Sequence, residues 1–281
     1  MKWKIIADSG CDLREIEQLA ADTQYVNVPL TIQIGDTTYV DDDTLDCDAM
    51  MEAMYASSEK TSSACPSSMV YMEAFEGAEN VLVVTITGTL SGSYNSAMVA
   101  KGIYQEQHPD VNIHVFNSLS TAGVMCLLVE KLNQLIAEGH DFQTVVEKGT
   151  EYLQQHTRLL FVLARVDNLI KNGRLNKLVG KVVGLLNIRL VGKASDEGTL
   201  ELLHKPRGQK KAVEAAVSEM LAAGYQGGKV IFSQRNNESI CEQIMSRIRE
   251  QFPEAQAKIL PTSGLCSYYA EEEGILFGYE V

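Results

Sequence analysis

The fold is decided by one stretch of the chain, Val81-Leu-Val-Val-Thr-Ile-Thr-Gly-Thr-Leu-Ser-Gly-Ser-Tyr-Asn-Ser-Ala97. Its first seven residues are apolar or β-branched and do not alternate with polar ones, which predicts a strand buried on both faces of a parallel sheet. Gly88 ends this strand, a loop of small hydroxyl residues follows, and a helical pattern begins at about Ser93. This order places backbone N–H groups and short hydroxyls at a helix N-terminus, where an anion can bind. No Gly-x-x-x-x-Gly-Lys pattern is present, so the stretch is not a nucleotide-binding P-loop, and a plain strand-to-helix connection would look the same.

The same alternation continues on both sides of this stretch. Residues 3–7 predict a strand followed by the turn Asp8-Ser9-Gly10, and residues 112–116 predict a strand followed by a helix over 122–137. Strands that alternate with helices of this length imply a parallel sheet with helices on both faces. Ligands of such sheets bind beyond the carboxyl ends of the strands. The loops after residues 7, 87 and 116 open at that edge and all carry Ser or Thr.

The pattern changes near residue 158, where we place a domain boundary. Strands are predicted over 159–164, 188–193, 199–203, 229–233, 257–260 and 275–279, and helices over 166–171, 177–185, 209–223 and 239–251. The turn signal at Asp196-Glu-Gly198 indicates a hairpin, and hairpins with returning strands indicate a mixed sheet with helices on one face. We therefore predict two domains, a three-layer parallel α/β domain over 1–158 and a smaller mixed-sheet α/β domain over 159–281.

Three polar segments of the first domain carry more specific expectations. Asp12 is placed to cap a helix that runs to about residue 21. Residues 41–44 predict a solvated loop whose carboxylates make caps and turns. The Ser- and Thr-rich residues 57–68 predict a loop that delivers hydroxyls to a helix start at Pro66-Ser67.

Composition excludes several classes of function. The net charge of −13 argues against a nucleic-acid surface and against attraction to anionic membranes. No run of residues is long and apolar enough to span a membrane, and the N-terminus meets Asp8 too early for a signal peptide, so we expect a cytoplasmic location. The six cysteines form no Cys-x-x-Cys pair and have no His at zinc-finger spacing, so no metal site is predicted. Cys65 is the one cysteine for which a reactive thiol stays open.

Five short segments, in order, resemble the motifs of a known family. Thr89-Leu-Ser-Gly-Ser-Tyr-Asn-Ser-Ala97 is similar to the Leu-Ser-Gly-Thr-Tyr-Gln-Ser-Ala signature of the DegV family of bacterial fatty-acid-binding proteins. The other four are Asp8-Ser-Gly-Cys-Asp-Leu13, Pro29-Leu30 with Tyr39 and Asp41, Ser63-Ala-Cys-Pro-Ser67, and Leu169-Ile-Lys-Asn-Gly-Arg-Leu175, the last followed by Pro206-Arg-Gly-Gln-Lys-Lys-Ala212. The matches span residues 8–212, and it is their order that makes the set specific.

The resemblance implies a fold and a ligand. In members of the family, a parallel α/β domain is followed by a smaller mixed-sheet domain, and a long-chain fatty acid lies buried between the two domains. By position in the motifs, Ser63 and Ser91 are expected to hold the carboxylate, with help from the Gly92 N–H and with Arg174 beside the head group. A hydroxyl can donate to a carboxylate without adding a buried charge. Helix capping by Ser63 and Ser91 is the plainer interpretation, and it is compatible with binding.

The resemblance also implies a partner. In the family a separate fatty-acid kinase phosphorylates the bound acid to an acyl phosphate, and the carrier supplies no catalytic base and needs no cofactor. The basic cluster, defined as Lys205, Arg207, Lys210 and Lys211, is the densest in this acidic chain and is expected to dock that kinase; a solvated helix start is the alternative.

Two features leave alternatives open. Many family members carry a C-terminal His that contacts the carboxylate, whereas the last histidine of this chain is His204, so Ser263, Ser267 or Tyr268 is expected to replace it by a neutral hydrogen bond. A serine-dependent hydrolase or acyl transferase that uses Ser91 is the alternative function, although Gly-x-Ser-x-Gly is absent. A third interpretation is an interaction module, which predicts a site filled with side chains.

Overall fold

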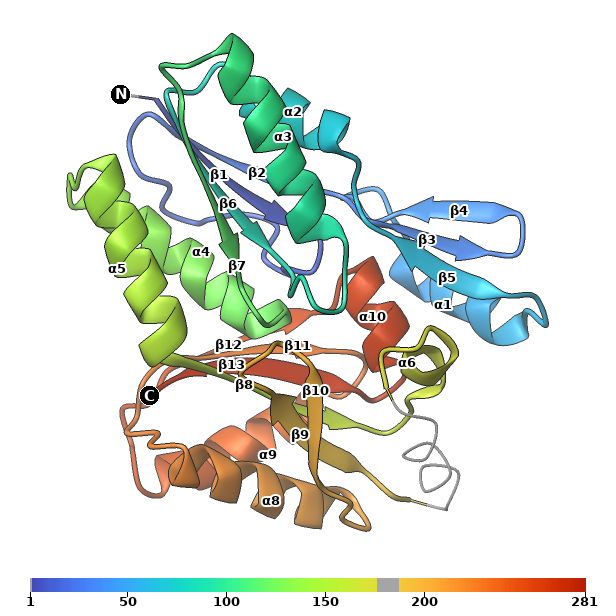
Figure 1. Cartoon of the computed structure of the whole chain (residues 1–281). Helices are drawn as coiled ribbons and strands as arrows, with labels where there is room; N and C mark the ends of the chain where they lie inside the picture. Colours follow the sequence, from blue (N-terminus) through green and yellow to red (C-terminus); the bar gives the residue numbers. More distant parts are fainter. Residues whose placement is uncertain (1, 176–186) are drawn as a thin grey trace.

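The structure is a computed structural model that describes residues 2–175 and 187–281 (Figure 1). The helix predicted over residues 177–185 lies outside the described residues. The described chain forms three sheets: a parallel sheet of four strands, a mixed sheet of six strands and a small antiparallel sheet of three. This arrangement confirms the predicted fold class of a parallel α/β unit with a separate mixed sheet.

The parallel sheet has the strand order β2-β1-β6-β7. Its strands are β1 (Trp3–Asp8), β2 (Thr23–Val28), β6 (Asn80–Thr85) and β7 (Asn112–Asn117). All six residues of β6 are buried, as its unbroken apolar pattern predicts. Helices α2 (Ser68–Phe75) and α3 (Ser93–Gln107) cover one face, and α4 (Ala122–Ala137) and α5 (Phe142–Gln155) cover the other.

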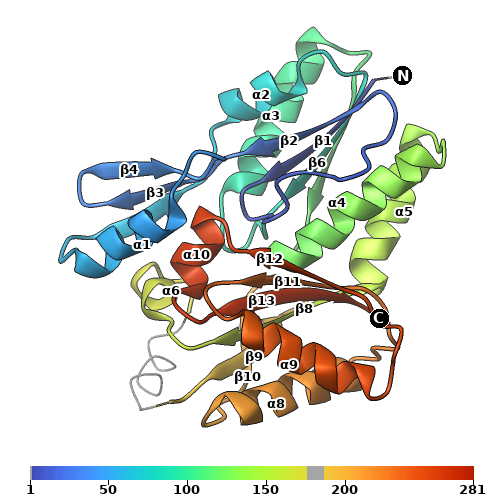
Figure 2. The ribbon, with the colours of Figure 1, turned by 180° about the vertical axis from the view of Figure 1, so that it is seen from behind.

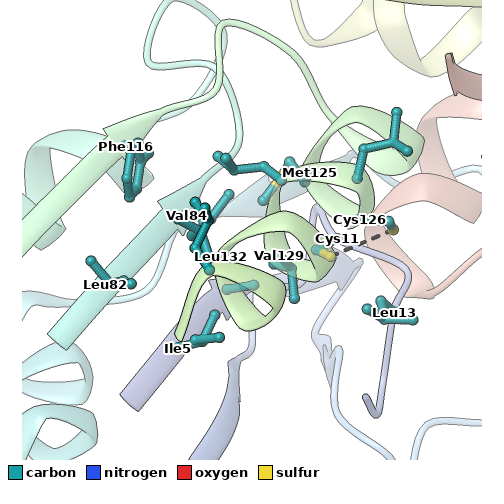
Figure 3. Close-up of a cluster of buried hydrophobic side chains, with 14 of the residues drawn as sticks. Ile5, Cys11, Leu13, Leu82, Val84, Phe116, Met125, Cys126, Val129 and Leu132 are labelled. Carbon is teal, nitrogen blue, oxygen red and sulfur yellow. Dashed lines mark hydrogen bonds between the residues drawn. The ribbon is translucent and has the colours of Figure 1, made fainter. Parts of the chain in front are cut away.

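Alternating side chains of β1 divide the core of this part of the molecule into two layers. Ile6 packs with Ala97 of α3, whereas Ile5 packs with Met125 of α4. Figure 3 shows the second layer, where leucine, valine and methionine side chains of α4 meet β1 and β6. Two buried thiols, Cys11 and Cys126, join this layer with their sulfur atoms 3.6 Å apart.

The six-stranded sheet has the order β10-β9-β8-β13-β11-β12 and is mixed. Only β11 and β12 are parallel neighbours in it, and β9 and β10 form the predicted hairpin. Helices α8 (Gln209–Ala222) and α9 (Glu238–Arg249) cover one face (Figure 2). The strands are β8 (Thr157–Leu163), β9 (Leu190–Ala194), β10 (Leu200–His204), β11 (Val230–Gln234), β12 (Ala257–Pro261) and β13 (Ile275–Glu280).

The opposite face of the six-stranded sheet is covered as well, which the prediction of helices on one face did not include. Helix α4 lies between the parallel and the six-stranded sheets and packs on both (Figure 1). Its first turn approaches β13 so closely that a Cβ atom on Gly123 would lie 2.3 Å from the backbone nitrogen of Gly278. Glycine at both positions is therefore what lets the two halves of the molecule meet at this point.

The small sheet has the order β4-β3-β5 and packs on α1 (Cys47–Ala56). Its strands are β3 (Thr31–Ile34), β4 (Thr37–Val40) and β5 (Thr61–Ala64). The predicted loop over residues 57–68 therefore contains a strand, because β5 pairs with β3, which lies about thirty residues earlier in the chain. The helix start predicted at its end is confirmed, since Ser67 Oγ accepts from the N–H of Val70 at the start of α2.

Of the predictions about aspartates in the first half, the helix capped by Asp12 was wrong, and the solvated loop over residues 41–44 was wrong for Asp41, although Asp41 and Asp42 do make the predicted cap and turn. Residues 9–22, all of them described, contain no helix, because the Asp12 carboxylate accepts instead from the N–H and the hydroxyl of Ser263, at 2.7 and 2.6 Å. Asp41 is fully buried rather than solvated. It accepts from the N–H groups of Gly264 and Leu265, and so caps helix α10 (Gly264–Ala270), which the sequence did not predict.

The predicted domain boundary after residue 158 falls inside β8, two residues after the strand begins. The change from the parallel to the six-stranded sheet occurs between α5 and β8. The division into two domains stays a prediction. Among the described residues, no helix has both the length and the apolar character that crossing a membrane requires.

Candidate functional site

A cavity of about 320 Å³ lies where the small sheet, the loop after β6 and helix α10 come together. Its walls are mostly apolar, and it has the size of the smaller pockets that bind small molecules, roughly 300–1,000 Å³. Both halves of the chain line it: Leu30, Ser63, Ala64, Cys65, Ile86, Leu90, Ser91, Gly92 and Thr121 from the first, and Leu163, Leu169, Arg174, Leu200, Leu265, Cys266, Tyr269, Ala270 and Leu276 from the second.

All four residues predicted to surround a carboxylate line this cavity. Ser63 comes from β5 and is not a helix cap, whereas Ser91 lies in the loop between β6 and α3 and its Oγ accepts from the N–H of Ser93, the first residue of α3. Gly92 is the N-cap residue of α3 and lies against Cys65, the residue after β5: a Cβ atom on Gly92 would be 2.9 Å from the Cys65 sulfur. Two hydroxyl-bearing segments that are about thirty residues apart in sequence are thus brought to one side of the cavity.

The loop that carries Ser91 is held from behind by a buried carboxylate. Asp8, at the end of β1, accepts from the N–H groups of Gly10 and Ile86, at 3.0 Å each, and from the hydroxyl of Ser93. Burial raises the pKa of Asp8 to about 6, against the lowering effect of these hydrogen bonds. The Asp8 side chain therefore ties the ends of β1 and β6 to the first turn of α3, and this fixes where Ser91 lies.

Each predicted serine keeps a proton that it can donate. Ser91 Oγ accepts from the N–H of Ser93 at 3.3 Å, so its own hydroxyl proton can point into the cavity. Ser63 Oγ lies 2.8 Å from the hydroxyl of Tyr269 on α10. A serine hydroxyl combines one donor with two acceptor positions, so these contacts are compatible with donation to an anion.

Arg174 bridges the two halves of the chain at the same side of the cavity. Its Nη1 donates to the carbonyl of Asn172 at 2.6 Å, and its Nε donates to the carbonyl of Leu90 at 3.3 Å. Its guanidinium carbon lies 5.8 Å from the centre of the Tyr269 ring. A guanidinium has five N–H donors, so these two bonds leave donors with which to bind an anion.

The three residues that were expected to replace the family's C-terminal histidine do not line the cavity. Ser263 and Ser267 are buried and bonded to Asp12 and Thr262, and Tyr268 is bonded to Thr61, so none of the three lines the cavity. The residue at the cavity is Tyr269, which sequence reasoning missed. The pair Tyr268-Tyr269 was a signal for it, because adjacent tyrosines on a helix point in different directions and one of the two can face the cavity. The helix itself was not predicted.

Of the remaining predicted positions, the basic cluster lies outside the cavity, whereas Cys65 lies in its wall. The basic cluster is exposed at the end of β10 and the start of α8, about 15 Å of strand away from Leu200 in the cavity wall. Cys65 lines the cavity and is exposed. Within residues 2–175 and 187–281, no group of three or more His, Cys, Asp or Glu side chains could hold a metal ion.

A serine hydrolase needs a base that takes the proton of its nucleophile. All five histidines of the chain lie in the described part, and none of them lines the cavity beside Ser91. An interaction module with an incidental pocket predicts a site filled by side chains, whereas this cavity is open. The geometry is that of a binding site, with donors on one side and apolar walls.

The chain matches a protein family described as uncharacterised proteins of the DegV family, over residues 2–279. It is 63% identical over 281 residues to a DegV domain-containing protein of Streptococcus pneumoniae, with all of both chains covered. It is 56% identical, over the same length, to one from Streptococcus pyogenes.

Solved structures with the same fold hold fatty acids. The crystal structure of the fatty acid kinase B3 protein of Streptococcus pneumoniae, loaded with linoleic acid, is 63% identical, covers 100% of both chains and superposes with a TM-score of 0.98. A DegV family protein from Eubacterium eligens, loaded with heptadecanoic acid, is 35% identical with a TM-score of 0.95 and 99% of both chains covered. One from Ruminococcus gnavus, refined with vaccenic acid, is 32% identical, has a TM-score of 0.89 and covers 98% of this chain and 99% of its own.

Proposed function

This chain belongs to the DegV family, and we propose that it binds a long-chain fatty acid in its cavity and presents the carboxylate to a separate fatty-acid kinase. The observation that carries the proposal is one cavity in which Ser63, Ser91, Gly92 and Arg174 all meet apolar walls from both halves of the chain. Three relatives hold long-chain fatty acids, and a relative 63% identical is named as a fatty acid kinase B3 protein. The alternative, a hydrolase that uses Ser91, is not favoured.

The two parts of such a ligand would contribute differently to its affinity. Burial of an acyl chain contributes roughly 0.8 kcal/mol per methylene, so a dozen methylenes contribute about 10 kcal/mol before the cost of ordering the chain. A hydrogen bond to the carboxylate contributes about 1.5–3 kcal/mol. The tail therefore supplies most of the affinity, and the hydroxyls and Arg174 decide which end of the ligand meets the polar side of the cavity.

Local donors are needed because the chain as a whole repels anions. Its net charge is −13, so long-range electrostatics disfavours a carboxylate. Ser63, Ser91 and the Gly92 N–H would hold the carboxylate without a buried counter-charge, and Arg174 would add one positive charge beside it. The protein needs no cofactor for this function, and a cytoplasmic location fits it, because the nucleotide phosphates that kinases use are found there.

Extraction of the purified protein tests the ligand. The protein is denatured, extracted into organic solvent and analysed by mass spectrometry, and a delipidated sample is titrated with linoleic acid by calorimetry. We expect a long-chain fatty acid in the extract and binding of the added acid with one site per chain. An extract without fatty acid, together with no binding of the added acid, would contradict the proposal.

The basic cluster is our proposal for the contact with the kinase. All four side chains are exposed, and they could attract a phosphate-handling partner in an otherwise acidic chain. The double variant Lys210→Glu/Lys211→Glu should slow acyl-phosphate formation by an added fatty-acid kinase and leave fatty-acid binding unchanged. The matched control is Lys131→Glu/Lys148→Glu, which reverses two charges on α4 and α5. Equal slowing by both variants would point to general charge effects rather than docking.

A further inference from the structure

The hydroxyl of Tyr269 lies at the polar side of the cavity and has no assigned role. The side chain lines the cavity, and its Oη is 2.8 Å from Ser63 Oγ. Its ring lies under the Arg174 guanidinium. Tyr269 thus contacts two of the four residues that we propose for the carboxylate, although it comes from α10, about two hundred residues after Ser63.

The position of this hydroxyl is fixed by a second tyrosine beside it. Tyr268 packs edge-on against Tyr269, with ring centres 4.8 Å apart and planes at 77°. The Tyr268 hydroxyl lies 2.6 Å from Thr61 Oγ1 and accepts from Asn172 Nδ2 at 2.9 Å. Thr61 and Ser63 are alternate residues of β5 and face the same side of the strand. The two tyrosines therefore meet two hydroxyls on the same side of β5. Of the two pairs, only Ser63 with Tyr269 lies in the cavity wall.

Helix α10 is itself held rigidly at both ends. The Asp41 carboxylate accepts from the first N–H groups of the helix, at 2.7 and 2.8 Å. Just past its last residue, Glu271 accepts from the N–H of Asn168 at 2.9 Å. A side chain on a helix held in this way has little freedom to move, which is the condition for a precise hydrogen bond to a ligand.

The chemistry of the pair suits an anion. A tyrosine hydroxyl donates one proton and adds no charge, and so does a serine hydroxyl. Within the protein, Ser63 and Tyr269 serve as partners for each other. Because both hydroxyls can rotate, both protons can also turn to a carboxylate placed between them and Ser91, and each bond would then be made to a charged acceptor.

We propose that Tyr269 is a further ligand of the fatty-acid carboxylate, which binds it by a hydrogen bond from the phenol hydroxyl alongside Ser63 and Ser91. This inference rests on the proposed function. Arg174 is a positioning residue for Tyr269 as well as a donor, because its guanidinium lies over the ring and is anchored to the carbonyls of Leu90 and Asn172.

The test removes one hydroxyl at a time and compares two ligands with the same tail. Delipidated wild type, Tyr269→Phe and Tyr268→Phe are titrated with linoleic acid and with linoleyl alcohol. Tyr268→Phe is the matched control, because it loses the same atom from a neighbouring ring that does not line the cavity. For Tyr269→Phe we expect the Kd of the acid to rise about tenfold, the low end for one hydrogen bond to a charged group, and the Kd of the alcohol to rise less than about threefold.

For Tyr268→Phe we expect a lower unfolding temperature and an unchanged ratio of the two Kd values. Equal weakening of acid and alcohol by Tyr269→Phe would overturn the proposal, because it would show a packing role. Wild-type affinity of Tyr269→Phe for the acid would overturn it as well. If the wild type itself bound neither ligand, the proposed function would fail, which is a separate outcome from failure of the Tyr269 variant alone.

Discussion

The polar side of the cavity and its apolar walls are built in different ways. The walls include leucines of regular strands, such as Leu163 on β8 and Leu276 on β13, whose direction follows from the sheet. The polar side depends on single hydrogen bonds between distant segments, such as the one between Ser63 and Tyr269. Substitutions in the walls should therefore change the affinity for the ligand by an amount that depends on the volume added or removed, whereas loss of one hydroxyl oxygen on the polar side removes a whole hydrogen bond.

Filling the apolar part should have the largest effect on ligand affinity. Leu163→Trp puts extra volume into the cavity and displaces about three to four methylenes of a long chain, at roughly 0.8 kcal/mol each. We expect the Kd of linoleic acid to rise about 100-fold, measured by calorimetry. A ten-carbon acid is the control and should lose little affinity. Equal losses for both acids would show that Leu163 does not contact the far end of the tail, and circular dichroism checks that the variant is folded.

Removal of a single hydroxyl from the polar side should have an intermediate effect. Ser63→Ala and Ser91→Ala should each raise the Kd of linoleic acid about tenfold, because each loses one hydrogen bond to a charged group. Ser63→Thr keeps the hydroxyl and should stay within about threefold of wild type. Competition with a fluorescent fatty acid measures all three variants. A normal Kd for both alanine variants would break the distinction between the two parts of the cavity.

The buried carboxylate behind the polar side predicts a pH dependence of stability. The pKa of Asp8 is about 6 in the folded chain and about 3.8 when unfolded, because burial disfavours its charge. The folded state therefore holds more protons between these values, so the free energy of unfolding falls as pH rises through this window and levels off above about pH 6. The slope from this one group is at most about 1.4 kcal/mol per pH unit.

Urea unfolding between pH 5.2 and 7.5 measures this slope, and the change expected over that range is about 1 kcal/mol. Asp8→Asn should remove its part of the slope. Glu271→Gln serves as the comparison, because burial raises the pKa of Glu271 to about 7. The fall in the free energy of unfolding that Glu271 causes should therefore extend to higher pH than the fall that Asp8 causes. Identical pH profiles for wild type and Asp8→Asn would show that Asp8 does not titrate in this range.

Local patterns in the sequence were sufficient to predict much of the fold. The bounds of α4 agree with the predicted helix over residues 122–137 to the residue, because the apolar spacing that defines this helix lies within the segment itself. The buried strand β6 and the hydroxyl-rich loop after it are explained in the same way. The fatty-acid interpretation, by contrast, came from the ordered motifs and their resemblance to a family.

The parts that the sequence did not predict depend on contacts between distant residues. Asp12 looks like a helix cap, but Ser263 is the group that it binds, and Asp41 caps a helix more than two hundred residues later. Tyr269 was missed for the same reason, since α10 carries few local helix signals and its start is satisfied from outside. No spacing rule within one segment can show such a partner.

The smallest effect tests how closely the two polar segments approach. Gly92 has a φ of −75°, so alanine there causes no backbone strain, but its Cβ would lie 2.9 Å from the sulfur of Cys65. The thiol can rotate away, so we expect Gly92→Ala to raise the Kd of linoleic acid only about twofold to threefold, measured by calorimetry. Adding Cys65→Ala removes the obstructing atom and should restore the wild-type Kd, whereas Cys65→Ala alone should change little. If the double variant stayed as weak as Gly92→Ala, the close approach of Cys65 to the α3 N-terminus would not be what shapes the polar side of the cavity. The added methyl group would then have to act directly on the ligand.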